Sequence, residues 1–154
     1  MHASNKTSIA SILLISLHVL LGIGALFGGG GMIIDPTGAL IQLPFSLLNE
    51  TPFTSFLIPG IILFVLLGIL PLITAFGLIT KRPWKLTETL NVFPNQHWSY
   101  SFSLYIGFLL IGWITIQMYL INGIGLLHVI YIFWGLLIVW VTVVVGNRKH
   151  GITR

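Results

Sequence analysis

Apolar residues fill four long stretches of the chain, at residues 8–27, 53–79, 99–121 and 126–146. Prolines, glycines and most polar residues gather in the segments between them. Each stretch holds about 20 residues, and a helix of that length measures about 30 Å, enough to cross the hydrocarbon core of a bilayer. The pattern predicts an all-α integral membrane protein, a single domain (1–154) formed by an antiparallel bundle of four transmembrane helices.

The connections between these stretches differ in character. Segment 28–52 opens with four glycines and passes through the turn sequence Asp35-Pro36-Thr37-Gly38. Because 39–48 is apolar again, unlike a solvated loop, we expect a long apolar outer loop that lies at the membrane interface as a short helix or lid. Segment 80–98 holds basic and aromatic residues, whereas the minimal connection 122–125 makes the last two helices antiparallel neighbours.

Small and polar residues follow one seam along each predicted helix. Lipid-facing polar groups are costly and small residues allow close helix contact, so we expect these seams to face inward. A second face of the third helix, with Ser103, Gly107 and Gln117, is expected to point elsewhere, toward another subunit. The predicted inward seams are Ser8, Ser11, Ile15, His18, Gly22 and Ala25; Phe64, Gly68, Pro71 and Ala75; Ser101, Tyr105, Phe108, Gly112, Thr115 and Tyr119; and His128, Tyr131, Gly135, Ile138 and Thr142.

The composition agrees with a membrane location. Hydrophobic residues make up 56% of the chain and charged residues only 6%, with a mean hydropathy of +1.02, so too few charges are present to cover a soluble domain. The chain has no cysteine, which excludes disulfides, thiol chemistry and cysteine-ligated metals.

The charges also predict an orientation. Basic residues precede the first span and follow the second and fourth, so all seven fall on one side of the topology, whereas Asp35 and Glu50 fall on the other. By the positive-inside rule we expect a multi-pass plasma membrane protein with both termini and the loop 80–98 in the cytoplasm. Topology thereby explains the basic residues, and we expect no nucleic-acid partner.

Two histidines are candidate functional groups. His18 lies near the middle of the first span and His128 within a turn of the outer surface. Each either serves a function, as intramembrane ionisable groups commonly do, or only hydrogen-bonds a neighbouring helix. Their depths differ by roughly 10 Å and no third ligand lies at a similar depth, so we expect neither a bis-histidine haem nor a metal site.

Four polar residues gather near the predicted outer leaflet. These are Gln117, Tyr119, His128 and Tyr131, and together with His18 they form the candidate ligand-binding set. Two interpretations stay open: they form the polar end of a pocket closed by the lid, or an interhelical hydrogen-bond set that joins the third and fourth helices.

Two absences limit the function. No Asp or Glu lies within a predicted span, which argues against an ion-coupled transporter, and no catalytic or nucleotide-binding motif is present. We therefore expect no catalytic residues and a non-enzymatic protein that binds a hydrophobic small molecule or lipid, or a protein partner, as an accessory subunit or homo-oligomer. The alternative is a histidine-dependent membrane enzyme or a haem-binding redox protein.

Short motifs are spread over most of the chain. They are Asp35-Pro36-Thr37-Gly38, Leu43-Pro44, Thr51-Pro52-Phe53, Ile58-Pro59-Gly60, His97-Trp98, Trp113 and Gln117. In these the chain resembles small bacterial four-helix membrane proteins, loosely similar to the DoxX-like group. The resemblance implies the fold and a membrane location, with no activity to carry over.

Overall fold

The computed structural model describes residues 9–93 and 95–150, with the backbone alone described for 147–150. Every regular element in this part of the chain is helical. In chain order the elements are α1 (Ile9–Ile34), η1 (Ala39–Ile41), η2 (Phe45–Leu48), α2 (Leu57–Ile62), η3 (Leu63–Ile69), α3 (Leu70–Thr80), α4 (Lys85–Glu88), α5 (Trp98–Ile121) and α6 (Leu126–His150). The short elements η1 and η2 are 3₁₀ turns, and η3 is a π-helical segment that joins α2 to α3 without a break.

The described residues contain four helices long and apolar enough to cross a membrane. They are Ile9–Ile34, Leu57–Thr80, Trp98–Ile121 and Leu126–Gly146. The predicted all-α chain with four such helices is therefore confirmed for this part of the protein.

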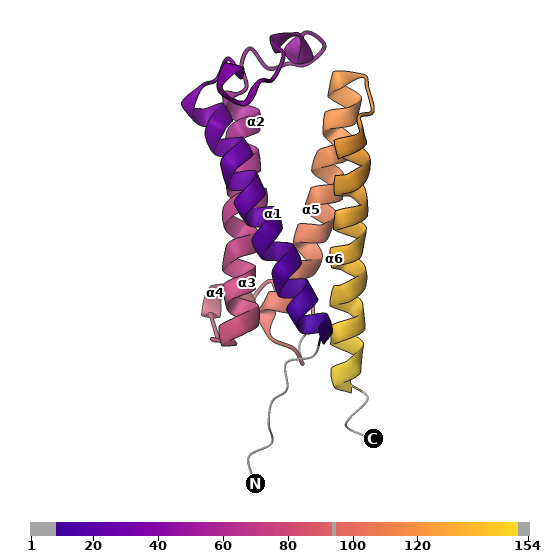
Figure 1. Ribbon diagram of the computed structural model, residues 1–154. Coiled ribbons are helices and arrows are strands. Elements are labelled where there is room, and N and C mark those ends of the chain that lie inside the picture. Colours follow the sequence, from indigo (N-terminus) through magenta and orange to yellow (C-terminus); the bar gives the residue numbers. More distant parts are fainter. Residues whose placement is uncertain (1–8, 94, 151–154) are drawn as a thin grey trace.

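The four long helices form two antiparallel pairs (Figure 1). One pair is α1 with the continuous helix α2–η3–α3, and the other is α5 with α6. The pairs contact each other where α1 meets α6 and where α3 meets α5, near the end at which α1 begins and α6 finishes. Toward the opposite end they diverge, so the bundle is packed at one end and open at the other.

Charged residues lie at both ends of the bundle. Lys81, Arg82 and Lys85 follow α3 at the packed end, whereas Asp35 and Glu50 belong to the connection at the open end. Among the other basic residues, Lys6 and Arg154 lie outside the described residues, as do the side chains of Arg148 and Lys149.

The glycine run that the sequence places in a loop is helical instead. Helix α1 continues through Gly28–Gly31 and ends at Ile34. A Cβ atom on Gly29 would lie 2.7 Å from the backbone nitrogen of Phe64 and 2.8 Å from the backbone oxygen of Gly60. Glycine therefore lets two backbones touch, and this packing outweighs the poor helix propensity of glycine. The connection that follows, residues 35–56, is called the lid segment below.

Ser101 of the predicted seam is buried, but beyond it helix α5 presents a different face to the bundle from the one that the sequence seam predicts. Phe108 and Tyr119 of the predicted seam are 58% and 84% exposed, whereas Ser103 and Gly107 of the other face are buried. Gly107 packs against α6, where its Cβ would lie 3.1 Å from the backbone oxygen of Gly135.

Local hydrogen bonds explain this error. The Thr115 hydroxyl donates to the Ile111 carbonyl oxygen of its own helix at 2.7 Å, and the Tyr105 hydroxyl donates to the Leu90 carbonyl at 2.8 Å. A hydroxyl group that already donates to a nearby backbone carbonyl can face outward without leaving an unpaired hydrogen-bond donor.

Proline alters the middle of the second long helix. Pro71 has no N–H, so it cannot continue the regular hydrogen-bond ladder of an α-helix. The preceding residue, Leu70, donates its N–H to the Val65 carbonyl, five residues back, and the helix widens into the π-helical segment η3. This wide turn presents Leu63 and Leu67 to the space between the two helix pairs.

Candidate functional site

A pocket of about 460 Å³ lies between the two diverging helix pairs, beneath the lid segment. Its volume is in the range of small-molecule sites, about 300–1,000 Å³. Its walls come from α1, the lid segment, α2–η3, α5 and α6. The residues that line it are Leu21, Gly24, Ala25, Gly28, Met32, Leu43, Leu47, Leu48, Thr51, Phe53, Phe56, Pro59, Leu63, Leu67, Leu110, Trp113, Ile114, Gln117, Leu120, Ile121, Leu127, His128 and Tyr131.

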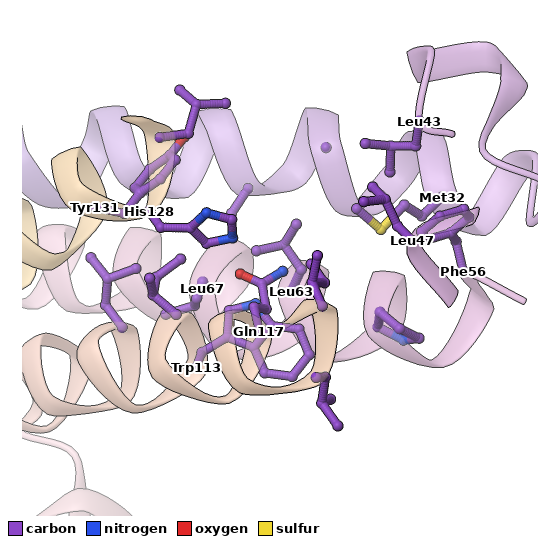
Figure 2. Close-up of a pocket in the computed structure, with 18 of the residues that line it drawn as sticks. Met32, Leu43, Leu47, Phe56, Leu63, Leu67, Trp113, Gln117, His128 and Tyr131 are labelled. Carbon is purple, nitrogen blue, oxygen red and sulfur yellow. The ribbon is translucent and has the colours of Figure 1, made fainter. Parts of the chain in front are cut away.

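The polar groups of the pocket lie almost entirely on one wall. Trp113 and Gln117 are one turn apart on α5, and His128 and Tyr131 are one turn apart on α6, so each pair shares a helix face. Figure 2 shows Gln117, His128 and Tyr131 toward one end of the pocket and the apolar Met32, Leu43, Leu47 and Phe56 toward the other. The pocket is therefore amphipathic along its length.

One hydrogen bond determines which tautomer the neutral His128 ring adopts. The backbone N–H of Gly125 donates to its Nδ1 atom at 3.0 Å. Because a neutral imidazole has one acceptor nitrogen and one N–H, this bond assigns the hydrogen to Nε2. Nε2–H has no acceptor among the described residues, so it is an unused hydrogen-bond donor at the pocket.

The other polar side chains of this wall also lack partners within the described protein. Neither Gln117 nor Tyr131 makes a hydrogen bond there, and the Trp113 Nε1–H is fully buried without an acceptor. Of these groups only the Trp113 Nε1–H is buried, and an unpaired polar group is costly in such apolar surroundings.

The lid segment closes the far end of the pocket with apolar side chains. Leu43, Leu47 and Leu48 line the pocket, and Phe56 packs edge-on against Phe45 with ring centroids 6.3 Å apart. Within this segment the apolar residues 39–48 form two 3₁₀ turns, η1 and η2.

A turn at Asp35 begins the lid segment, as its sequence predicts. One carboxylate oxygen of Asp35 accepts from the hydroxyl of Thr37 at 2.6 Å and from its N–H at 3.1 Å, and the other accepts from the N–H of Leu40 at 2.8 Å. The hydrogen bond from the Thr37 hydroxyl, followed by that from the Leu40 N–H, lowers the pKa of Asp35. These hydrogen bonds therefore favour the ionised form of the carboxylate.

The structure brings three of the five candidate residues together. Gln117, His128 and Tyr131 line the pocket, whereas Tyr119 lies outside its lining and is 84% exposed. Trp113 belongs to the same wall but was absent from the predicted set. Its spacing of one turn from Gln117 is the signal that could have found it.

His18 lies deeper in the bundle, at the packed end, and does not line the pocket. Its Nε2 atom is 2.6 Å from the Ser103 hydroxyl, which is 2.8 Å from the Thr142 hydroxyl, and none of the three residues is more than 1% exposed. These two hydrogen bonds join α1 to α5 and α5 to α6.

The directions of these bonds follow from counting hydrogens. Thr142 donates its only hydroxyl hydrogen to the Ile138 carbonyl at 2.7 Å, so it accepts from Ser103. Ser103 has then used its own hydrogen and accepts from His18, which must carry a hydrogen on Nε2. Nδ1 of His18 is buried without a partner among the described residues. His18 thus fits the structural interpretation that the sequence left open.

The two histidines are not brought together. Thr142 lies about 21 Å from His128 along α6, at roughly 1.5 Å of rise per residue, and His18 is linked to Thr142 through Ser103 alone. This separation does not allow both imidazoles to ligate one haem iron. The described residues also contain no group of three or more His, Asp or Glu side chains that could hold a metal ion.

A second hollow, of about 620 Å³, lies on the other side of the pocket wall, between η3, α3 and α5. Its lining is apolar except for Tyr105 and the indole of Trp113, and it includes Gly112. Leu67 and Trp113 line both spaces, so these two side chains form the partition between them.

No family model, curated protein or solved structure matches the chain. The candidate site is therefore defined by its geometry alone.

Proposed function

We propose that this protein is a non-enzymatic integral membrane protein that binds a hydrophobic small molecule or lipid in the pocket beneath the lid segment. The observation that supports this most is the combination of an apolar pocket of about 460 Å³ with a wall of unpartnered polar side chains. Pockets of this kind, mostly apolar with a few convergent polar groups, are typical of ligand sites.

A pocket favours this function over the other possibilities that the sequence leaves open. A protein that acted only through a partner on a helix face would have no need for an internal space that ends in Gln117 and His128. A histidine-dependent redox function would place His18 in the same space as His128, but Ser103 and Thr142 hold it elsewhere.

The proposed location is the plasma membrane, with both termini and α4 in the cytoplasm, by the positive-inside rule. Lys81, Arg82 and Lys85 support this assignment, because they lie at the end opposite Asp35 and Glu50. The cysteine-free chain allows a direct test with single cysteines at the exposed positions Ser46 and Thr89. A membrane-impermeant thiol reagent should label Ser46→Cys in intact cells and Thr89→Cys only after lysis; the reverse pattern would overturn the orientation.

Binding is best tested with a variant that fills the pocket without disturbing the helices. Gly24 lines the pocket, and a Cβ atom added there meets no atom within 4 Å. Gly112 is the matched control, because a Cβ there also meets nothing within 4 Å, but it lines only the second hollow.

The measurement is retention of radiolabelled dodecane by the purified protein in mild detergent. Wild type and Gly112→Leu should retain the probe alike, and Gly24→Leu should retain about tenfold less. Equal retention by all three proteins would show that the pocket does not hold the probe, and it would overturn the proposed function.

A further inference from the structure

We infer that the occupant of the pocket is a neutral apolar molecule with a carbonyl group, held by hydrogen bonds from the α5–α6 wall. This inference rests on the proposed function and adds the chemical class of the ligand. It follows from three properties of the lining: which groups donate, which charges are missing, and where the apolar surface lies.

His128 is the first hydrogen-bond donor of the pocket wall. Since the Gly125 N–H occupies Nδ1, the only hydrogen-bonding group that the neutral ring offers to the pocket is Nε2–H. A ligand that meets this group must supply an acceptor. The side-chain amide of Gln117 adds N–H donors from the facing helix, with no intramolecular partner among the described residues. A carbonyl oxygen has two lone pairs and can accept from both.

Charge restricts the acceptor further. Every residue that lines the pocket is formally uncharged, with no Lys, Arg, Asp or Glu among them. An ionised carboxylate or phosphate buried here would lack a counter-charge, and burying an unpaired charge is very costly. A ketone or an ester has the acceptor oxygen without that penalty.

The position of the apolar surface defines the rest of the ligand. From the polar wall the pocket extends to Met32 of α1 and to Leu47 and Phe56 of the lid segment (Figure 2). The hydrophobic effect favours an alkyl or other apolar body in that part. The same ligand chemistry is found in a free ketone and in the ester of a membrane lipid whose acyl chain enters the pocket.

The test compares two probes of equal length, dodecane and methyl decyl ketone, which differ only in the carbonyl group. Retention of each probe is measured on wild type, Gly24→Leu and Gly112→Leu. We expect the ketone to bind wild type about three- to tenfold more tightly than the hydrocarbon, the size of one net hydrogen bond. Equal binding of the two probes would overturn the carbonyl assignment and leave the proposed function intact, whereas retention of neither would overturn both.

Two substitutions of His128 identify the donor. His128→Leu should remove most of the preference for the ketone while dodecane is still retained. His128→Gln keeps an N–H near the Nε2 position and should restore the preference in part. A ketone preference unchanged in His128→Leu would show that this side chain is not a donor to the ligand.

The source of the carbonyl is decided on protein extracted in mild detergent before any probe is added. An ester lipid as the occupant predicts that a diacyl lipid copurifies with wild type and Gly112→Leu, is reduced in Gly24→Leu, and is displaced by methyl decyl ketone. If the occupant is a free carbonyl compound, we expect a bound mass smaller than that of a diacyl lipid, with the same dependence on the variants. A pocket that holds ordered water alone, with no bound organic molecule and no preference for the ketone, would also overturn the inference.

Discussion

The buried chain from His18 through Ser103 to Thr142 allows a quantitative test of how the two helix pairs are held together. The perturbation is Ser103→Ala, which removes one hydroxyl from a fully buried position. It leaves the His18 Nε2–H without its acceptor at 2.6 Å. Thr142 loses a donor but keeps its own bond to the Ile138 carbonyl, so the main cost falls on His18.

The expected magnitude follows from the burial of His18. Orphaning a buried donor costs about 1–3 kcal/mol in soluble proteins, whereas interhelical hydrogen bonds in membranes average about 0.6 and reach about 1.7 kcal/mol. Because His18 is 0% exposed and its Nδ1 already lacks a partner, water cannot readily replace the lost bond. We therefore expect Ser103→Ala to lower the free energy of unfolding by about 1–2 kcal/mol.

The assay is reversible unfolding by SDS in mixed micelles, and the matched control is Ser16→Ala. Ser16 is an exposed serine on α1 with no hydrogen bond among the described residues, so its loss should change stability by less than about 0.5 kcal/mol. A double-mutant cycle with His18→Leu isolates the pair and should give a coupling energy near 1 kcal/mol. A coupling energy of zero, or equal effects of the two serine substitutions, would refute the assigned hydrogen-bond chain.

Four further substitutions test the packing of α1, the lid turn and the pocket wall. Gly29→Ala should destabilise by about 1–3 kcal/mol, because its Cβ would lie 2.7 Å from the Phe64 nitrogen, whereas Gly30→Ala, with its nearest contact at 3.7 Å, should stabilise by about 0.5–1 kcal/mol. Asp35→Asn should lower the melting temperature at neutral pH, because its amide nitrogen cannot accept the Leu40 N–H. The folded-state pKa of Asp35 lies below its ordinary value of 3.8, so the difference from wild type should be full above that pH and shrink as acid protonates the carboxylate. Trp113→Phe should change the free energy of unfolding by less than about 1.5 kcal/mol, since the indole N–H has no acceptor to lose.

Each of these expectations has a result that contradicts it. If Gly29→Ala and Gly30→Ala have the same effect in SDS unfolding, the backbone contact between α1 and the second long helix is wrong. A melting difference for Asp35→Asn that does not vary as the pH falls below 3.8 would exclude the carboxylate as the acceptor that orders the lid segment. A large loss of stability in Trp113→Phe would show that the indole N–H has a partner.

The sequence predicts the four long helices because their apolar runs match the thickness of a bilayer. It also places Gln117, His128 and Tyr131 near one end of the molecule, since all three lie close to the short connection between α5 and α6. Their convergence on one pocket needed the structure, because helix rotation cannot be obtained from depth alone. Tyr119 lies at a similar depth but points away.

Two errors in the sequence prediction share a physical cause. From residue type alone, the glycines at 28–31 indicate a loop. From residue type and helical spacing, Thr115 and Tyr119 indicate a face that points into the bundle. The structure decides otherwise, because Gly29 gains a backbone contact with α2–η3 and Thr115 bonds its own helix. Neither partner is visible in a hydropathy pattern. The divergence of the two helix pairs, which creates the pocket, likewise has no signal in the sequence.

We propose that the space between the helix pairs holds an apolar molecule. Native mass spectrometry of gently extracted protein is the sharpest test, because it reports a bound mass without a choice of probe. We expect an additional bound mass on wild type and on Gly112→Leu that is lost from Gly24→Leu. Bare protein mass for all three, or a bound mass that persists in Gly24→Leu, would contradict it.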